Sequence, residues 1–351
     1  MSDFQNVSEC GAAARSIQAN QPRRTHLFVV NPRSFRYAGG PDKLIAEIRA
    51  CFQNNVQEEH HIHISRYPRD AVGVVRRFAA SVQEGTIVRV YAVGGDGILF
   101  DCLNGIVGIS NMELAAVPYG NTNDFVRSFG EGKTALFRDI AKQVSAGTVK
   151  TDIIYCGSNY AMNFCTVGVE SASIMHTMRL THAFDWLIRL SRRAVPILFI
   201  VGGIFGILDR RVREQEYSVS LDGLRTEGRY TTINIANGPC YGGDKSAVTS
   251  ALPNDGALDI LMLKSAKLSQ LRILKIIPRY LRGGYYRYPE LFRYRRVRKA
   301  EISSNTPILV NLDGEVFFDT NIAVEVIPQA IDVVAVDGLE YKRRSDAREP
   351  Q

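Results

Sequence analysis

The sequence has few cysteines, and their spacing excludes two kinds of site. Among 351 residues there are six cysteines, scattered and without a Cys-x-x-Cys pair. This spacing indicates neither a zinc site nor a disulfide framework, and it favours a reduced, cytoplasmic setting. The six are Cys10, Cys51, Cys102, Cys156, Cys165 and Cys240.

Long apolar runs are also scarce. The segment nearest to a membrane span is 194–208, which contains Pro196 and three glycines. It is shorter than the roughly 20 residues that a spanning helix needs, so no transmembrane span is expected. Two interpretations stay open, a helix packed in the core and an interfacial helix that docks on a membrane.

The N-terminus lacks the features of a secretory signal. It carries an acid at Asp3 and no apolar run, which argues against secretion. Residues 1–23 are expected to form a polar, flexible leader.

The overall composition is that of an ordinary globular protein, with 45% hydrophobic and 23% charged residues. A chain of this length is expected to form two domains. Lysine and arginine number 43 against 36 acidic residues, which gives a net charge of +7. Such an excess suits an anionic partner: a nucleotide, a nucleic acid or an acidic membrane surface.

The first part of the chain alternates strands and helices, as in a doubly wound α/β domain. We expect a nucleotide-binding domain of this class over 24–150. His61 and His63 in its second strand could ligate a metal, but no third ligand is placed nearby, and a half-exposed strand is the alternative. Strands are expected near 26–30, 60–65, 86–93 and 115–118, and helices near 41–52, 70–83, 98–106 and 133–145.

The pattern changes near residue 150, where strands begin to follow one another with few helices between them. We therefore expect an antiparallel β-rich domain over 151–320, with residues 321–351 returning to the first domain. Helices are expected near 179–208 and 267–282, and strands near 148–155, 159–168, 216–222, 228–236, 257–263, 296–303 and 308–312.

A glycine-rich turn follows the strand at 86–93. Gly94, Gly95 and Gly97 surround a single acid, Asp96. Glycines let the backbone approach a phosphate closely, and a carboxylate beside phosphate makes sense if a divalent cation or a hydroxyl losing its proton lies between them. The alternative is a strand-to-helix turn with Asp96 as its cap.

Three later segments add polar turns. Residues 119–127 form a second glycine-containing turn into a helix, and Asp313-Gly314-Glu315 is an Asp-Gly turn between strands. Glu315 is either a surface residue or a carboxylate presented to a cleft between the domains. The turn at 253–259 could wrap a cation with Asp255 and backbone carbonyls, or be a simple Asp-Gly turn.

Residues 279–299 combine eight basic and six aromatic residues. Such a segment can bind single-stranded nucleic acid or lie at the headgroup level of a membrane. A solvated helix and connector is the third interpretation.

The ordered set of motifs resembles the diacylglycerol kinase catalytic-domain family, which includes bacterial diacylglycerol kinases and the sphingosine and ceramide kinases. The resemblance covers roughly residues 25 to 340. The matching motifs, in order, are Asn31-Pro32 with Ser34, Gly94-Gly95-Asp96-Gly97, Gly120 with Asn123-Asp124-Phe125, Thr151-Asp152, Tyr241-Gly242-Gly243, Asp255-Gly256 with Leu258-Asp259, and Asp313-Gly314-Glu315.

The resemblance implies an ATP-dependent kinase with its active site in the interdomain cleft. Asp96 and Asp124 would organise Mg²⁺ and the phosphates, Glu315 would be the general base for a lipid hydroxyl, and Asp152 a supporting acid. A second, structural Mg²⁺ would be bound by Asp255 and the carbonyls of Leu252 and Ala257. The implied ATP-binding residues are Asn31, Ser34, Gly94, Gly95, Asp96, Gly97, Gly120, Asn121 and Asn123.

Both glycine-containing turns depart from the family pattern. Ile98 stands where the family has threonine, and Asp101 where it has glutamate. Residues 120–124 read Gly-Asn-Thr-Asn-Asp, where many members have Gly-Thr-Gly-Asn-Asp or a close variant. These changes bear on nucleotide affinity and rate. Because Asp96, Asp124 and Glu315 are all present, an active enzyme is expected rather than a pseudokinase.

The sequence therefore predicts a lipid kinase that phosphorylates a diacylglycerol-like or sphingoid lipid while peripherally associated with a membrane, with no nucleic-acid partner. Two alternatives are a lipid-binding regulatory protein without activity and a kinase of a soluble small molecule such as a dinucleotide. The oligomeric state stays open, with a homodimer as one option.

Overall fold

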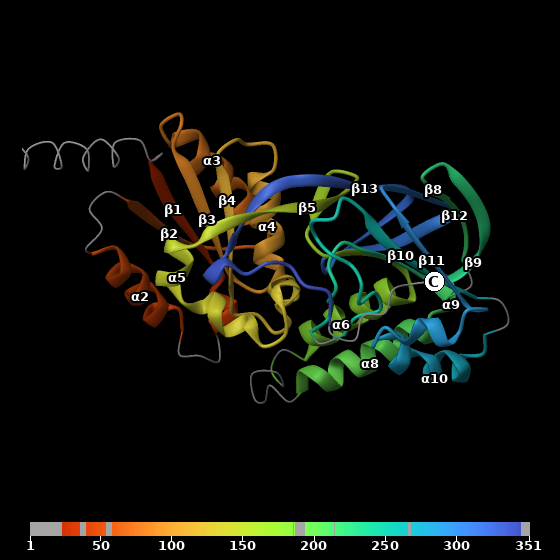
Figure 1. Cartoon of the computed structure of the whole chain (residues 1–351). Helices are drawn as coiled ribbons and strands as arrows, with labels where there is room; N and C mark the ends of the chain where they lie inside the picture. The colour runs from red at the N-terminus through yellow and green to blue at the C-terminus, as the bar shows by residue number, and fades with distance from the viewer. Residues whose placement is uncertain are drawn as a thin grey trace, which may run out of the picture.

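The computed structural model describes residues 23–35, 40–53, 58–184, 186, 194–213, 215–243, 245–265 and 268–344. These residues form two lobes joined by long strands (Figure 1). The first lobe is α/β and the second consists mainly of antiparallel strands, which confirms the predicted order of the two domain types.

The first lobe is built on parallel strands in the order β4-β3-β1-β2. Leu27 of β1 packs towards α3 and α4, whereas Phe28 faces the other side, towards α2. Helices therefore cover both faces, and the carboxyl ends of the strands form the edge where polar loops gather. The elements are β1 (Arg24–Val30), α2 (Asp42–Phe52), β2 (Glu59–Ile64), α3 (Asp70–Ser81), β3 (Ile87–Gly94), α4 (Asp96–Ile106), β4 (Met112–Pro118) and α5 (Ile140–Ser145).

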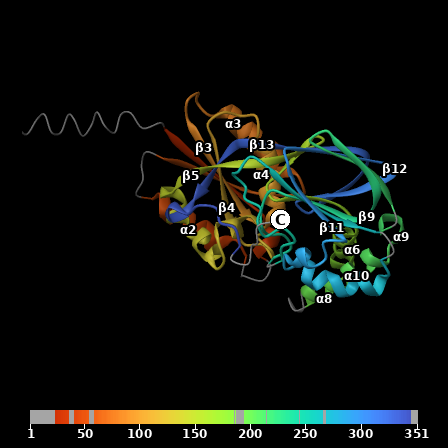
Figure 2. The ribbon, with the colours of Figure 1, turned by 45° about the vertical axis from the view of Figure 1, so that its right-hand side comes forward.

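The second lobe encloses its own apolar core between antiparallel strands, and a layer of helices lies along one side of it (Figure 2). Its strands are β7 (Phe164–Gly168), β8 (Glu216–Leu221), β9 (Leu224–Ala236), β10 (Leu258–Lys264), β11 (Phe292–Val297) and β12 (Lys299–Leu312). Its helices are α6 (Val169–Ala183), α8 (Ala194–Leu208), α9 (Arg210–Arg213) and α10 (Gln270–Tyr280). Among the helices that the structure describes, none has the length and apolar character needed to cross a membrane.

Two long strands run between the lobes. β5 (Gly147–Cys156) pairs with β13 (Glu315–Ala335) and with the short β6 (Asn159–Ala161). β13 pairs with β12 in the second lobe, and its last residues lie parallel to β4 in the first, with Asp332 opposite Glu113. The lobes thus share one hydrogen-bonded sheet.

Several predicted elements differ from the observed ones. The helix expected at 133–145 is a 3₁₀ helix, Lys133–Arg138, followed by α5, because Asp139 caps α5 by accepting a hydrogen bond from the Lys142 amide. The strand expected at 159–168 is interrupted after Ala161, since the Asp313 side chain accepts the next backbone N–H groups. The helix expected from 179 begins at Val169.

The segment 279–299 is neither a long helix nor an unstructured connector. It contains the end of α10, a 3₁₀ turn at Gly284–Arg287 and the strand β11, which pairs with β10. The strands expected at 296–303 and 308–312 are a single strand, β12, with an irregularity between Ser303 and Ile308. The Asp-Gly turn at 313–315 predicts a strand after it but not the length of that strand, which is β13, Glu315–Ala335.

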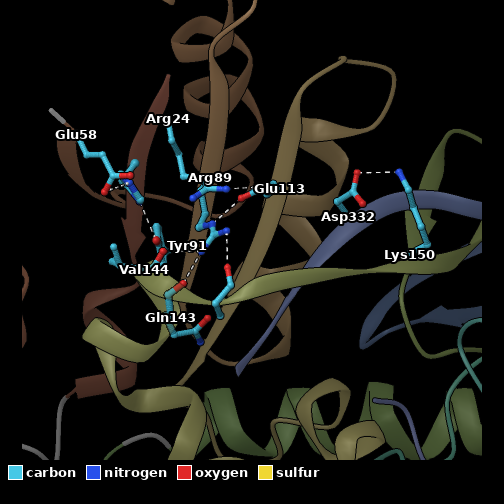
Figure 3. A network of polar contacts seen from close by, with 11 residues as sticks. Arg24, Glu58, Arg89, Tyr91, Glu113, Gln143, Val144, Lys150 and Asp332 are labelled. Atoms are coloured by element: carbon cyan, nitrogen blue, oxygen red, sulfur yellow. Dashed lines mark hydrogen bonds and ion pairs between the residues drawn. The ribbon is translucent and has the colours of Figure 1, made fainter. Parts of the chain in front are cut away.

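A buried arginine fixes the position of α5 against the sheet (Figure 3). Arg89 of β3 is fully buried and lies 2.5 Å from the Glu113 carboxylate. Its guanidinium also donates to the carbonyls of Gln143, Val144 and Ala146, at 2.6, 2.9 and 2.8 Å. The last carbonyls of a helix have no partners within the helix, so this cation satisfies both them and the buried carboxylate.

Replacing Arg89 should therefore destabilise the first lobe strongly. Arg89→Met leaves three carbonyls without their donor and leaves the Glu113 carboxylate with Arg24 alone, 3.3 Å away, and it should lower the free energy of unfolding by about 3–5 kcal/mol. Arg225→Met removes an arginine whose side chain is 68% exposed, and should change it by less than about 0.5 kcal/mol. Urea unfolding measures both, and similar losses in the two variants would contradict the assignment.

Candidate active site

The two glycine-containing turns of the first lobe lie in direct contact. A Cβ atom on Gly120 would be 2.3 Å from the Gly95 Cα atom, so no side chain fits between the turns. The amides of Tyr119 and Gly120 donate to the Gly94 carbonyl, at 2.7 and 3.0 Å. These contacts leave bare backbone at the carboxyl edge of the sheet.

The end of β1 adjoins the same turn. A Cβ atom on Gly94 would lie 3.0 Å from Ser34 Oγ, 3.2 Å from Asn31 Cβ and 2.8 Å from Ile98 Cγ2. The backbone amide of Asn31 donates to the Val93 carbonyl at 2.9 Å, which fixes the position of this residue. The structure thus brings together Asn31, Ser34 and the glycine turn, which were grouped from the sequence.

Asp96 binds the second turn rather than capping its own helix. Its Oδ2 accepts a hydrogen bond from Thr122 Oγ1 at 2.6 Å, and its Oδ1 accepts one from the Asp124 amide at 2.8 Å. The α4 N-terminus has no side-chain cap. A carboxylate has about four acceptor positions, so both oxygens keep capacity for a cation.

Asn123 shapes the second turn from within. It adopts a left-handed conformation, with φ of 51°. Its side-chain oxygen accepts from the Gly120 amide, and its side-chain nitrogen donates to the Gly120 carbonyl, both at 2.9 Å. The Asn123 side chain is therefore committed to the turn, whereas Asn121 is exposed at its tip.

Asp124 connects the two lobes. Its carboxylate is buried and accepts hydrogen bonds from the amides of Gly242 and Gly243, at 2.6 and 2.7 Å. Burial raises the pKa of Asp124 well above its usual range, and the nearby Asp96 carboxylate adds to this effect. The glycine loop of the second lobe is thus attached to the two glycine-containing turns of the first lobe.

Asp313 fixes the turn that presents Glu315. The buried Asp313 carboxylate accepts from the amides of Met162 and Phe164, at 2.5 and 2.9 Å. Burial raises the pKa of Asp313 to about 7 although these amides oppose the shift. Glu315, two residues later, is exposed.

A cavity of about 200 Å³ opens between these segments. Glu315 lines it together with Gly97 and Asp101, which lie far from Glu315 in the sequence. Sequence reasoning missed its basic wall, although the loop after β2 lies at the same carboxyl edge as the motifs and carries two arginines. That wall consists of Arg33, Ser65, Arg66, Tyr67, Pro68 and Arg69.

Arg69 and Asp101 form an ion pair at this cavity. The backbone of Arg69 adopts a left-handed conformation, with φ of 67°, and its backbone amide donates to Asp101 Oδ2 at 3.0 Å. Its guanidinium lies 3.5 Å from Asp101 Oδ1 and 5.1 Å from the centre of the Phe100 ring. Burial raises the pKa of Asp101 to about 6; Arg69 opposes the shift and Glu315 adds to it.

Asp152 occupies a different place. It is fully buried, and its two oxygens accept hydrogen bonds from the amides of Gly256 and Gln329, both at 2.7 Å. It is not among the residues that line the cavity beside Glu315. Its observed contacts therefore attach the 253–259 turn to β13.

The predicted structural metal site contains a cationic side chain. Arg296 Nη2 donates to Asp255 Oδ2 at 2.6 Å, and Arg296 Nε lies 3.9 Å from Asp259 Oδ2. Two carboxylates suit a hard cation, yet an arginine already pairs with Asp255 and lies close to Asp259. Among the residues that the structure describes, no group of three His, Cys, Asp or Glu side chains is placed to bind a metal ion. The predicted ligands Leu252, Asp255 and Ala257 stay a prediction.

The two histidines of β2, for which a metal site is the weaker interpretation, have other partners. His63 Nε2 lies 2.8 Å from Asp70 Oδ2, and the His61 ring packs against Phe78 with centroids 4.9 Å apart. Exposed and partly buried residues alternate along most of β2, which agrees with the interpretation of this segment as a half-exposed strand.

Comparison with known families agrees with this geometry. Residues 25–156 match the model of the diacylglycerol kinase catalytic domain, and residues 200–335 match that of the YegS C-terminal NAD kinase beta sandwich-like domain. Together the matches span well over half of the chain and include every motif on which the predicted resemblance was based. That resemblance is confirmed.

The individual relatives share only a quarter or less of their aligned residues with this chain. A Staphylococcus aureus (strain MSSA476) protein named "Putative lipid kinase" is 25% identical over 254 residues, which cover 71% of this chain and 78% of that protein. One from strain MRSA252 is 24% identical over 282 residues, which cover 79% and 87%. The crystal structure of a "putative diacylglycerol kinase" from Bacillus anthracis str. Sterne has a TM-score of 0.68 at 19% identity, over 92% of this chain and 99% of that chain. This last likeness supports the fold.

The pKa of Asp101 predicts a pH dependence of stability. An acid whose pKa rises on folding, here from 3.8 to about 6, stabilises the fold at low pH and loses this contribution as the pH rises through about 6. Asp101→Asn cannot ionise and should lack this component. The wild-type free energy of unfolding, measured in urea relative to the variant, should fall between about pH 4 and pH 7. A difference that rises with pH would contradict the assignment.

The Arg296 contact predicts how stability responds to magnesium. Without nucleotide, EDTA should leave the wild-type melting temperature unchanged, because Arg296 already neutralises Asp255. In Arg296→Gln, Mg²⁺ should raise it by about 1–2 °C for each kcal/mol of binding. Arg295→Gln, on the same strand, is the control. A clear fall of the wild-type melting temperature in EDTA that Asp255→Asn abolishes would show that Mg²⁺ binds here despite Arg296.

Proposed function

Because the chain belongs to the diacylglycerol kinase catalytic-domain family, we propose that it transfers the γ-phosphate of ATP to a hydroxyl of a diacylglycerol-like or sphingoid lipid. The observation that supports this most directly is the shared cavity of Glu315, Gly97 and three arginines. The cavity is lined by a carboxylate that can act as a base, a glycine turn that a phosphate can approach and three arginines. These groups come from distant parts of the chain.

The nucleotide would bind at the carboxyl edge of the first lobe. Phosphate groups can approach Gly94, Gly95 and Gly97 because no side chain blocks the backbone, and the N-terminus of α4 adds its dipole. Asn31 and Ser34 border this turn. Arg33 and Arg66 in the cavity wall would balance the phosphate charge.

Mg²⁺ fits at Asp96. Both Asp96 oxygens keep acceptor capacity beside the turn, and carboxylate oxygen is the ligand that Mg²⁺ prefers. When bound there, the ion would neutralise charge on the transferring phosphoryl group. Asp124 would support the same site by fixing the glycine loop of the second lobe.

Glu315 would act as the general base. Phosphoryl transfer needs little covalent assistance, but an alcohol is a weak acid and benefits from a positioned base. Glu315 is exposed at the cavity and follows a turn that Asp313 fixes through three backbone amides. It can therefore exchange a proton with solvent while its position is restrained.

One observation favours a second candidate, a lipid-binding regulatory member without activity. Ile98 replaces a hydroxyl at the glycine turn, and its side chain is 4% exposed and packs in the core. Calorimetry with Mg-ATP separates the two, because nucleotide binding with turnover excludes a purely binding role.

A test of the enzyme uses labelled phosphate transfer from Mg-ATP to a panel of lipids in mixed micelles. Glu315→Gln should lower kcat by about 10²- to 10⁴-fold, the usual contribution of a general base, with little change in the KM for ATP. Glu301→Gln, an exposed glutamate on β12, is the matched control and should retain full activity.

Two results would reject the proposal. One is the absence of transfer to any lipid, with Asp96→Ala indistinguishable from the wild type. The other is an equal loss of activity in Glu301→Gln and Glu315→Gln, which would remove the assigned role of Glu315. Transfer to a soluble dinucleotide but to no lipid would favour a small-molecule kinase instead.

A further inference from the structure

Helix α8 packs against α6 through two glycines. Cβ atoms on Gly202 and Gly206 would lie 2.1 Å from Thr177 Oγ1 and 2.3 Å from Ser173 Oγ. The four-residue spacing puts both glycines on one face of α8, and the two backbones approach closely there. One side of this apolar helix is therefore covered.

The opposite side of α8 is exposed and apolar. Ile197, Ile200, Ile204 and Leu208 recur at helical spacing and are 59%, 64%, 41% and 48% exposed. No charged residue occurs from 194 to 208. A surface helix of a water-soluble protein normally presents polar residues on its outer face, so this stripe indicates a partner.

The neighbouring helix α10 extends the surface. α8 and α10 lie side by side along the second lobe in both views (Figures 1 and 2), and Ile207 and Ile273 belong to one apolar cluster. Ile273 and Ile276 face inwards, whereas Leu271 and Leu274 are 72% and 42% exposed. The outer side of α10 is thus also apolar in part.

The charges around these leucines are mainly positive, with one acid among them, Glu290, which lies 3.6 Å from Arg272. Arg272, Lys275 and Arg279 are exposed on α10, and the helix contains no acidic residue. Arg210 and Arg211 follow α8 after a single acid, Asp209, which lies 3.6 Å from His176 Nε2, and both arginines are exposed. Apolar side chains with a basic rim match a bilayer of anionic lipids, into which the former insert while the latter bind headgroups.

We propose that the outer faces of α8 and α10 are a docking surface for an anionic lipid bilayer. The proposal rests on the proposed lipid kinase function, because it places the kinase on the surface that contains its acceptor. A second copy of the chain is a poorer occupant: a symmetric contact sets each patch against itself and would bring the basic residues of both copies together.

The docking surface is connected to the candidate active site. Lys245 Nζ lies 5.8 Å from the centre of the Phe199 ring on α8, and Lys245 follows closely on the loop whose amides bind Asp124. The cluster behind α8 and α10 also includes Val316, the residue after Glu315. A bilayer at this surface would therefore lie beside the segments that present the general base.

Sedimentation with sucrose-loaded vesicles tests the surface. The wild type should pellet with vesicles of phosphatidylcholine and phosphatidylglycerol, and weakly with phosphatidylcholine alone. Ile197→Glu with Ile200→Glu should weaken binding about tenfold or more for each isoleucine. Leu224→Glu, which alters an equally exposed leucine on β9 (70%), should bind like the wild type.

The basic rim has its own test. Arg272→Gln with Lys275→Gln should weaken binding to the anionic vesicles about fivefold for each charge removed and leave binding to phosphatidylcholine unchanged. Arg225→Gln, another exposed arginine, is the control. Melting temperatures of all variants should match the wild type, because every altered side chain is exposed.

Several results would overturn the docking surface. They are wild-type protein that does not pellet with anionic vesicles, isoleucine variants that bind normally, or an equal loss in Leu224→Glu. Sedimentation equilibrium in which Ile197→Glu with Ile200→Glu dissociates a dimer, while vesicle binding persists, would instead assign the face to a second copy.

Activity assays separate this proposal from the kinase function. The isoleucine variants should phosphorylate a short-chain lipid that is dispersed as monomers at the wild-type rate. On lipid embedded in vesicles, their rate should fall in proportion to the loss of vesicle binding. If no lipid is phosphorylated but vesicle binding depends on the isoleucines, the docking surface stands and the kinase function fails. If vesicle activity is unaffected by the variants, the docking surface fails and the kinase function stands.

Discussion

Carboxylates that bind backbone amides determine the arrangement of the candidate site. Asp96, which is partly buried, and the buried Asp124 and Asp313 lie in three turns, and each accepts hydrogen bonds from the backbone of another segment. Moving a carboxylate out of water is costly unless such bonds replace its hydration. The turns therefore have few alternative positions, since displacing one of them leaves a buried charge without its donors. A site that stabilises transferring phosphate depends on groups fixed in advance in this way.

This arrangement separates acids that position from an acid that can react. The carboxylates of Asp124, Asp152 and Asp313 are largely committed to backbone amides, and their burial removes them from contact with an incoming alcohol. Glu315 is exposed, and it follows directly on a turn that one of these acids fixes. The motifs alone assign a chemical role to every one of these acids, whereas in the structure Asp124, Asp152 and Asp313 bind backbone amides of neighbouring segments.

The sequence predicted the fold class and the grouping of the motifs because both depend on local signals. Hydrophobic periodicity identifies the strands of the first lobe, and glycine turns mark their carboxyl ends, where topology brings them together. What the sequence could not give depends on contacts between distant residues. Asp313 interrupts the strand near Asn163, and Arg296 neutralises Asp255 from 41 residues away. The outer face of α8 belongs to the same class, because average hydrophobicity does not tell which side of a helix is covered.

The change at Ile98 is best understood from its surroundings. The isoleucine packs into the core beside Gly94 and closes the base of the turn with an apolar contact instead of a hydroxyl. A hydroxyl at this point could donate one hydrogen bond to a phosphate oxygen. The cavity wall supplies guanidinium groups from Arg33, Arg66 and Arg69, and charge-assisted bonds to phosphate are about twice as strong as neutral ones. Losing one neutral hydrogen bond from a hydroxyl therefore costs less binding energy than charge-assisted bonds from the arginines can supply. One arginine that reaches the phosphates of a nucleotide is enough to compensate for Ile98.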